Sequence, residues 1–165
     1  MTMAQPSKEV RIRPMVETDL PRVNEIDRML FGDERVPTWP FSFEAYWSVY
    51  RPKLSLVAEM SNRVVGFVVG NIVPEEQSQS VLSLRHSPDR PTHHRRVGWI
   101  DMIGIDPESQ GGGIGRKLVD AFYEQCRQSD AAVKGIAREN DERLKKFLAS
   151  VGFKSSGLVV YEKDW

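Results

Sequence analysis

The sequence has very little cysteine and no long apolar run. A single cysteine, Cys126, excludes an internal disulfide and any metal site built from cysteines. It falls within a helical pattern, so we expect a buried structural thiol rather than a nucleophile. The longest apolar stretches, such as the run that begins at Val64, are too short to span a bilayer, and residues 1–10 lack the apolar core of a signal peptide. These absences predict a soluble cytoplasmic protein that does not associate with membranes.

The chain also has no excess charge of either sign. Its 165 residues include 23 Lys plus Arg and 23 Asp plus Glu, so the formal net charge is zero. No overall electrostatic field therefore favours nucleic acid as a partner. His93 and His94 are adjacent and have no carboxylate or cysteine at metal-ligand spacing, so we expect no metal site there. Any partner must be inferred from local motifs.

No break in composition divides the chain, and its length is sufficient for one domain with one core. We expect a flexible tail over residues 1–8 and a single domain over 9–165. Periodicity and turn signals predict a first half with a strand ending at Pro14, a helix capped by Thr18, a helix capped by Ser42, and strands over 54–60 and 64–73. A long connection follows over 74–96. The second half is predicted to have a strand over 97–106, a helix over 114–128, a strand over 131–137, a helix ended by Gly152, and a strand over 157–165. This order indicates a mixed α/β fold.

Two of these elements carry unusual side chains on one face. The helix after Ser42 has an aromatic stripe, which either packs in the core or lines an acceptor pocket, formed by Phe43, Tyr46, Trp47 and Tyr50. In the strand over 97–106, a regular pleat places four residues on one face, namely Trp99, Asp101, Ile103 and Ile105. Asp101 would then interrupt an apolar face.

A glycine cluster lies between that strand and the next helix, at Gly111, Gly112, Gly113 and Gly115. Glycine permits positive φ and close approach to the backbone, and the N-terminus of a helix presents unpaired N–H groups to an anion. We therefore expect the loop to bind phosphate. Neither common nucleotide template fits, because a dinucleotide fingerprint would need glycine at Leu118 and a P-loop would need glycine at Arg116.

The stretch "QGGGIG" from Gln110 to Gly115 instead follows the pattern Q-x-x-G-x-G, and here the chain resembles the GNAT acetyltransferase superfamily. The segments "VRIRPMVETDLPRV" and "ARENDERLKKFLASVGFK" resemble the opening and closing blocks of that family, so the resemblance covers nearly the whole chain. It implies a GNAT-like α/β fold with a mixed, mostly antiparallel central sheet of about six to seven strands flanked by four helices. It also implies an N-acetyltransferase that uses acetyl-CoA, without a metal, on an amine acceptor of unknown identity.

The resemblance assigns cofactor-binding roles to residues of this chain. The backbone of Ile103, Gly104 and Ile105 is expected to pair with the pantetheine arm, and Gln110 to brace the loop. The family asparagine is assigned to Asn140, although counting back from the closing Gly-Phe pair places Asp141 at that position. The pyrophosphate cradle is expected from the amides of Gly111, Gly112, Gly113, Ile114, Gly115 and Arg116.

Direct transfer needs a neutral amine, whereas an amine like that of lysine, with a pKa of about 10.4, is almost fully protonated at pH 7. A general base is therefore expected, with Asp101 as the first candidate and Glu139 as the second. Asp101 could equally be a salt-bridged strand residue. The backbone N–H near Ile105 is the expected oxyanion donor.

The family tyrosine that protonates the departing thiolate aligns with Leu148 in this sequence. Tyr161 is the catalytic substitute that we assign, with Tyr123 as another, although each could be an ordinary core or surface tyrosine. Loss of the acid is expected to slow transfer rather than abolish it, because a thiol with a pKa of about 8.5 leaves tolerably well without protonation.

Two functions of different classes follow. One is the acetyltransferase, and the other is a non-catalytic acyl-CoA-binding sensor or regulatory module, which Leu148 favours. The walls of the acceptor site are expected from residues 31–50 and 74–96. The oligomeric state stays open, a homodimer included.

Overall fold

The computed structural model describes residues 9–32, 42–74 and 96–157, together with Tyr161 and Lys163. The predicted tail over 1–8 and nearly all of the predicted connection over 74–96 lie outside these residues. So does most of the last predicted strand. Within the described ranges, no helix is both long enough and apolar enough to cross a bilayer.

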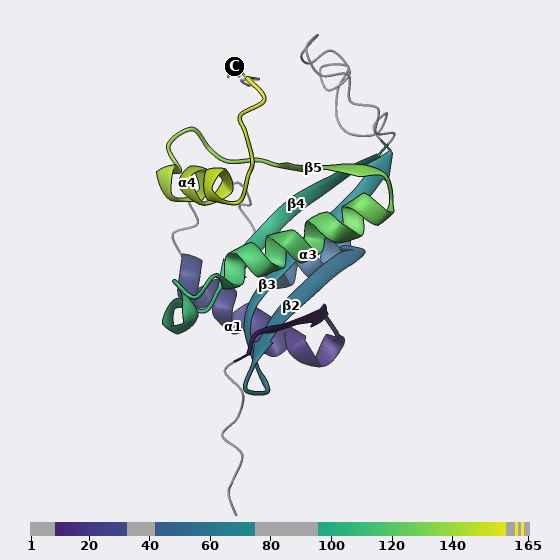
Figure 1. Ribbon diagram of the computed structural model, residues 1–165. Coiled ribbons are helices and arrows are strands. Elements are labelled where there is room, and N and C mark those ends of the chain that lie inside the picture. The colour runs from purple at the N-terminus through teal and green to yellow at the C-terminus, as the bar shows by residue number, and fades with distance from the viewer. Residues whose placement is uncertain (1–8, 33–41, 75–95, 158–160, 162, 164–165) are drawn as a thin grey trace, which may run out of the picture.

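A five-stranded sheet forms the centre of the described fold, with its strands in the order β1-β2-β3-β4-β5 (Figure 1). The pairs β1–β2, β2–β3 and β3–β4 are antiparallel, and the pair β4–β5 is parallel. The mixed, mostly antiparallel sheet is thus confirmed. The strands are β1 (Arg11–Pro14), β2 (Leu54–Met60), β3 (Arg63–Pro74), β4 (Arg96–Ile105) and β5 (Ala131–Gly135).

The expected number of six to seven strands is wrong for the described sheet, which has five. The apolar run over 157–165 predicts a further strand from local pattern alone, but a strand also requires a neighbour to pair with. The described residues of that segment, Gly157, Tyr161 and Lys163, lie in no strand.

The turn between β2 and β3 follows from local sequence. Ser61 and Asn62 have positive φ of 51° and 60°, and Met60 lies opposite Arg63. This is the geometry of a two-residue hairpin turn whose twist matches that of the strands. The turn therefore joins β2 and β3, both predicted as strands, into an antiparallel hairpin.

Four α-helices flank the described sheet, as predicted. They are α1 (Leu20–Phe31), α2 (Phe43–Tyr50), α3 (Ile114–Gln128) and α4 (Glu142–Ser150). Ser42 caps α2 as expected, since its side chain accepts the Ala45 N–H at 3.1 Å. Thr18 is not the cap of α1, because a short 3-10 turn, η1 (Glu17–Asp19), precedes that helix and leaves Asp19 at its N-cap.

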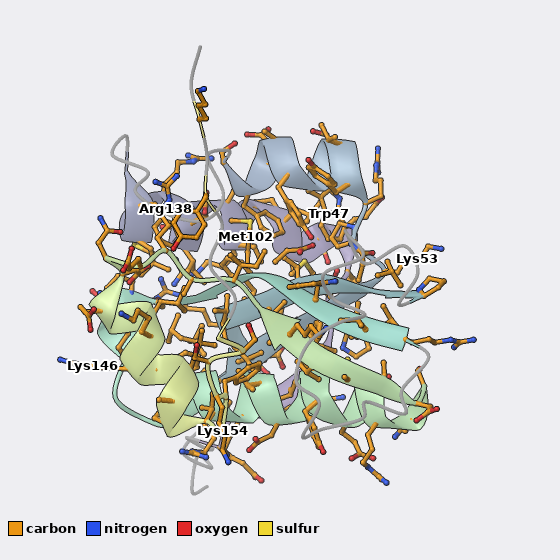
Figure 2. The ribbon with its side chains drawn as sticks, turned by 90° about the horizontal axis from the view of Figure 1, so that it is seen from above. Trp47, Lys53, Met102, Arg138, Lys146 and Lys154 are labelled. Carbon is orange, nitrogen blue, oxygen red and sulfur yellow. The ribbon has the colours of Figure 1, made fainter. Side chains whose placement is uncertain are left out.

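The two faces of the sheet are covered by different helices. Helix α3 packs on one face, and α1 with α2 pack on the other, as Figure 2 shows by the position of Trp47 and Met102 between the sheet and α2. Cys126 on α3 is fully buried, and burial raises the pKa of its thiol to about 11. The prediction of a structural thiol is confirmed.

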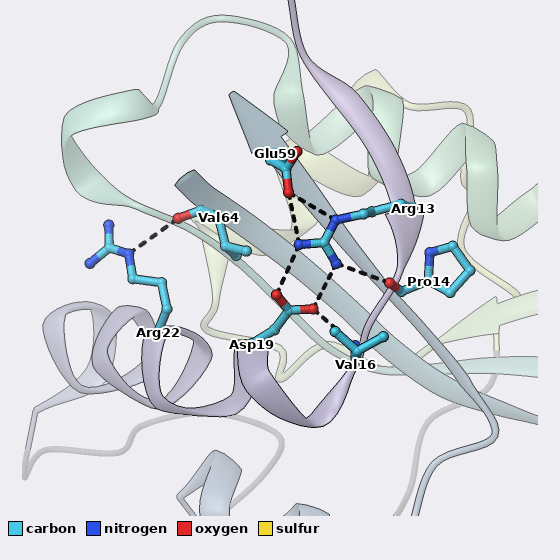
Figure 3. Close-up of polar contacts among 7 residues, drawn as sticks. All are labelled: Arg13, Pro14, Val16, Asp19, Arg22, Glu59 and Val64. Atoms are coloured by element: carbon cyan, nitrogen blue, oxygen red, sulfur yellow. Dashed lines mark hydrogen bonds and ion pairs between the residues drawn. The ribbon is translucent and has the colours of Figure 1, made fainter. Parts of the chain in front are cut away.

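An ion-pair network joins β1, η1 and β2 (Figure 3). The Arg13 guanidinium donates to Asp19 at 2.7 and 2.9 Å and to Glu59 at 2.9 Å. The Asp19 side chain is 8% exposed and also accepts the Val16 N–H at 2.9 Å. The Arg13 hydrogen bond, opposed by desolvation, lowers the pKa of Asp19 below its ordinary value. This network anchors the edge strand to the start of α1.

We expect Asp19→Asn to lower the free energy of unfolding by about 2 kcal/mol at pH 7, because it leaves Arg13 without its main partner. A lowered folded-state pKa contributes stability that is complete above the unfolded pKa, near 3.9, and is lost as the pH falls through the folded value. The difference between variant and wild type should therefore shrink below about pH 4, as urea unfolding at pH 7, 5 and 3 would measure.

Glu124→Gln is the matched control, since the Glu124 side chain is 44% exposed and its ion pair with Arg127 lies within α3. We expect this variant to unfold with wild-type stability at each pH. Equal destabilisation by the two variants would contradict the role given to the Arg13 network.

Candidate active site

The pairing of β4 with β5 stops halfway along β4. Opposed positions run from Arg96 and Ala131 to Ile100 and Gly135, after which β5 ends. Strand β4 continues to Ile105 and keeps its pairing with β3 on the other side. In the described part of the chain, no strand pairs with residues 101–105 on the β5 side. Figure 1 shows the chain turning away from β4 beyond β5. An extended ligand can pair with this free backbone edge.

Asp101 marks the start of the free edge and lies in a β-bulge. Gly70 is opposite Ile100 and Val69 is opposite Met102, so Asp101 has no opposed residue on β3. The bulge places Asp101 and Met102 on the same face of the sheet, toward α1 and α2.

The bulge corrects one expectation from the pleat. Trp99, Asp101, Ile103 and Ile105 do not share a face, because Ile103 and Ile105 pack toward α3 while the Asp101 side chain reaches α2. A bulge adds one residue to one strand and so reverses the alternation beyond it. Asp101 therefore does not interrupt the apolar face that Ile103 and Ile105 form.

Two uncharged side chains bind the Asp101 carboxylate. The Tyr46 hydroxyl donates to Oδ2 at 2.6 Å, and the Asn71 side chain forms a second hydrogen bond. Burial raises the pKa of Asp101, and the hydrogen bonds from Tyr46 and Asn71 lower it, so that desolvation decides the upward direction. Within the described residues Asp101 forms no ion pair.

The glycine loop lies directly beyond the free edge, after a 3-10 turn, η3 (Pro107–Ser109). Gly111 and Gly113 have positive φ of 88° and 75°, and a Cβ at either position would meet no heavy atom within 4 Å. Gly113 is the N-cap of α3, and no side chain caps that helix. The first N–H groups of α3 therefore have no side-chain cap in the described part of the chain, which suits a phosphate group.

Gln110 connects this loop to two other elements. Its Nε2 donates to the Ile105 carbonyl at 3.2 Å, and its Oε1 accepts from Arg143 Nη2 of α4 at 2.5 Å. The Arg116 guanidinium donates to the Ser150 carbonyl at the end of α4. Gly115 lies under Phe147, because a Cβ there would be 2.8 Å from the ring. Helix α4 thus packs beside the loop.

Sequence reasoning missed a buried ion pair below the loop. Asp106, which is 3% exposed, accepts the Glu108 N–H at 3.0 Å and pairs with Arg22 of α1. Arg22 also donates to the Val64 carbonyl at 3.1 Å (Figure 3), so through its two partners it ties α1 to β3 and to Asp106, at the start of η3. The Asp-Pro pair at the end of a predicted strand is a local capping signal for Asp106, but nothing local indicates Arg22.

The other predicted residues lie on segments that leave the sheet. Glu139 and Asn140 are exposed and, with Arg138, line an open cavity of about 660 Å³. Asp141 caps α4, with its carboxylate accepting the Leu144 N–H at 2.9 Å. Leu148 is half-buried on α4. Tyr161 is 91% exposed and Tyr123 is 55% exposed, so neither is packed against Asp101.

Most of the aromatic stripe of α2 packs in the core, the first of the two alternatives that the sequence left open. Phe43 and Tyr46 are fully buried core residues, and Trp47 packs against the same core. Tyr50 is 47% exposed and stacks on Tyr46, with the ring centroids 5.3 Å apart. Tyr46 is at once a core residue and a hydrogen-bond donor to Asp101, a role the stripe alone did not indicate.

These features agree with the comparisons to known proteins. The chain belongs to the acetyltransferase (GNAT) family, whose sequence model matches residues 20–153. It is therefore an acyltransferase of the acetyl-CoA-dependent N-acetyltransferase family. No curated protein matches the chain significantly.

Several solved structures share the fold at low sequence identity. One is the aminoglycoside antibiotic 6'-N-acetyltransferase AAC(6')-Ig from Acinetobacter haemolyticus, with a TM-score of 0.67, 16% identity, and coverage of 94% of this chain and 98% of that one. A transcriptional regulator from Bacillus halodurans C-125 has a TM-score of 0.67 and 18% identity, with coverage of 94% and 100%. AAC(6')-Iy in complex with CoA has a TM-score of 0.67 and 15% identity, with coverage of 99% of each chain.

Proposed function

We propose that this GNAT-family acetyltransferase transfers the acetyl group of acetyl-CoA directly to an amine, with Asp101 as the general base. One observation carries the proposal. The free edge of β4 begins at Asp101 and is followed by the glycine loop, which leads into α3 without a side-chain cap. A cosubstrate that pairs with the edge and places its phosphates on the loop would bring its acyl end toward the carboxylate.

The residues present fit acetyl-CoA. Gly111 and Gly113 adopt backbone conformations that keep the loop clear of side chains, and α3 lacks a side-chain cap. The pyrophosphate would lie on the amides of residues 111–116, and the pantetheine arm on the backbone of 103–105. Asn140, on the segment that leaves β5, lines the cavity and is the family asparagine of this proposal.

The proposed chemistry is a proton transfer coupled to one substitution. Asp101 takes a proton from the amine, directly or through one water, and the amine nitrogen attacks the acetyl carbonyl. The C–N bond forms, the C–S bond breaks, and the sulfur leaves with its electron pair, while the second proton that the nitrogen loses passes to the departing thiolate or to water. The oxyanion that forms in between would be held by a backbone N–H near Ile105.

A dedicated acid for the thiolate is not needed in this proposal. Leu148 stands where the family tyrosine is expected, and the pKa of Tyr46 lies well above its ordinary value, because burial and the hydrogen bond to Asp101 both raise it. Tyr46 is therefore a poor proton donor to a thiolate. The exposed Tyr161 stays a candidate, and Glu139 stays the alternative base.

The acceptor class is open to direct test. Because several proteins that share the fold are named aminoglycoside 6'-N-acetyltransferases, aminoglycosides belong in the first panel of amines, beside polyamines and lysine-containing peptides. We expect at least one class to release free thiol from acetyl-CoA well above the rate of hydrolysis, with a matching acetylated product by mass spectrometry.

The second candidate function is a non-catalytic acyl-CoA-binding module, which the packed Leu148 favours. It would show saturable binding of acetyl-CoA with no transfer to any amine of the panel. That result would overturn the enzyme proposal and leave the loop as a binding site alone.

A further inference from the structure

We propose that Tyr46 and Asn71 are positioning residues that hold the Asp101 carboxylate ionised and directed along the free edge of β4. This inference rests on the proposed function of Asp101 as general base. It adds two residues, from α2 and β3, to a site otherwise built from β4 and the glycine loop.

The bulge makes Asp101 dependent on neighbours from other elements. Because no β3 residue lies opposite Asp101, its position is not set by a regular ladder. Gly70 sits where the bulge forms, and a Cβ there would lie 1.8 Å from the Trp99 carbonyl oxygen. This close approach of the two backbones lies next to the bulge, and the Asp101 side chain reaches α2. The carboxylate then takes its fixed direction from the groups that bind it.

Asn71 is oriented by a contact on its far side. The Lys53 backbone N–H donates to Asn71 Oδ1 at 3.0 Å. Since a backbone N–H can only donate, the amide oxygen must point to Lys53, and the amide NH₂ is left to bind the Asp101 carboxylate. The amide cannot flip without losing both hydrogen bonds.

Tyr46 is equally constrained. Its side chain is fully buried, and its ring lies between Phe43, at a centroid distance of 6.2 Å, and Tyr50, at 5.3 Å. Because its pKa is raised, the hydroxyl keeps its proton at every pH at which the enzyme works, and so remains a donor. Two fixed donors from different directions therefore define both the charge and the orientation of Asp101.

The surrounding charges do not replace these donors. Among the described residues, Tyr46 and Asn71 are the side chains that shift the pKa of Asp101, and neither is charged. Lys134 of β5 lies over the Trp99 ring at 6.0 Å, and Asp27 of α1 accepts the Phe43 N–H at 3.0 Å. Other titratable groups on the elements that pack near Asp101 include Glu44 and Tyr50 of α2, Lys53 before β2, and Arg22, Glu25 and Arg28 of α1.

The test is the pH profile of kcat/KM in Tyr46→Phe and Asn71→Leu. Each variant removes one donor to the ionised carboxylate, so the pKa of Asp101 should rise and the acid limb should move to higher pH by about one unit. At pH values below the limb, kcat/KM should fall about tenfold relative to wild type. Ser48→Ala is the control, because it removes a hydroxyl from the exposed side of the same helix, where Ser48 donates to the Glu44 and Ala45 carbonyls.

The acceptor for this test is the best amine of the panel, and thermal melts show that each variant is folded. A shifted acid limb in a folded variant, with acetyl-CoA affinity unchanged, supports the assignment of that residue. An acid limb at the wild-type pH overturns it, since a merely structural residue changes stability but not the pKa of the base.

Asp101→Asn separates this inference from the proposed function. If Asp101→Asn keeps wild-type kcat/KM, the base assignment fails and the inference fails with it. If Asp101→Asn loses activity while Tyr46→Phe and Asn71→Leu keep the wild-type acid limb, the base assignment stands and only the positioning role is overturned.

Discussion

Asp101→Asn is expected to lower kcat/KM for the best amine by about 10²- to 10³-fold, the usual contribution of a general base. The substitution keeps the shape of the side chain and leaves Oδ1 able to accept the Tyr46 hydroxyl, so the fold around the bulge should persist. The glycine loop is untouched, and acetyl-CoA affinity should therefore stay at the wild-type value. Steady-state kinetics and equilibrium binding of acetyl-CoA measure the two quantities separately.

The wild-type enzyme should also lose activity in acid. Asp101 acts only when ionised, and burial raises its pKa above the ordinary carboxyl value. As the pH falls through that raised pKa, the base is protonated and kcat/KM declines. The decline should be absent from whatever activity Asp101→Asn retains.

Glu139→Gln is the matched control, because Glu139 is the other candidate base and is exposed. We expect it to keep near wild-type kcat/KM. A large loss in Glu139→Gln with none in Asp101→Asn would exchange the two roles.

Gly70→Ala is expected to destabilise the protein by about 3 kcal/mol or more, because its Cβ would lie 1.8 Å from a backbone oxygen of β4. Unlike a flexible side chain, the Trp99 carbonyl cannot move away without breaking the β3–β4 ladder. For a chain of this size the melting temperature should fall by about 10 °C. Activity should fall as well, because the bulge that presents Asp101 depends on this close approach.

Gly135→Ala is the control, because Gly135 lies on the opposite side of Ile100 from Gly70. Both Gly70 and Gly135 lie opposite Ile100, one on β3 and the other on β5, yet a Cβ at Gly135 meets nothing within 4 Å. We expect its melting temperature to stay within about 2 °C of wild type. Similar behaviour of the two variants would show that the bulge tolerates a side chain.

Much of the architecture follows from local patterns. The hairpin at Ser61 and Asn62, the cap at Ser42 and the end of α4 at Gly152 each depend on residues within a few positions of one another. The glycine loop is also a local feature. Its glycine spacing excludes the dinucleotide fingerprint and the P-loop, and it fits the pattern Q-x-x-G-x-G. Short-range sterics and hydrogen bonds decide these features, and they can be recognised without knowing the fold.

The face of Asp101 could not be predicted in this way. A regular pleat groups Asp101 with Ile103 and Ile105, whereas the bulge places it on the opposite face. The bulge arises where Gly70 meets Trp99, and these residues are far apart in the sequence. The contacts of Asp101 with Tyr46 and Asn71, and of Arg22 with Asp106, likewise join distant segments.

The sequence by itself thus determined the family, the helices, the strand order along the chain and the glycine loop, because local periodicity or residue spacing specifies each of them. Only the tertiary structure decided where β4 and β5 separate, which face carries the carboxylate and which side chains hold it. These depend on how two backbones approach across the sheet, and that approach is set by packing between elements rather than by any one of them.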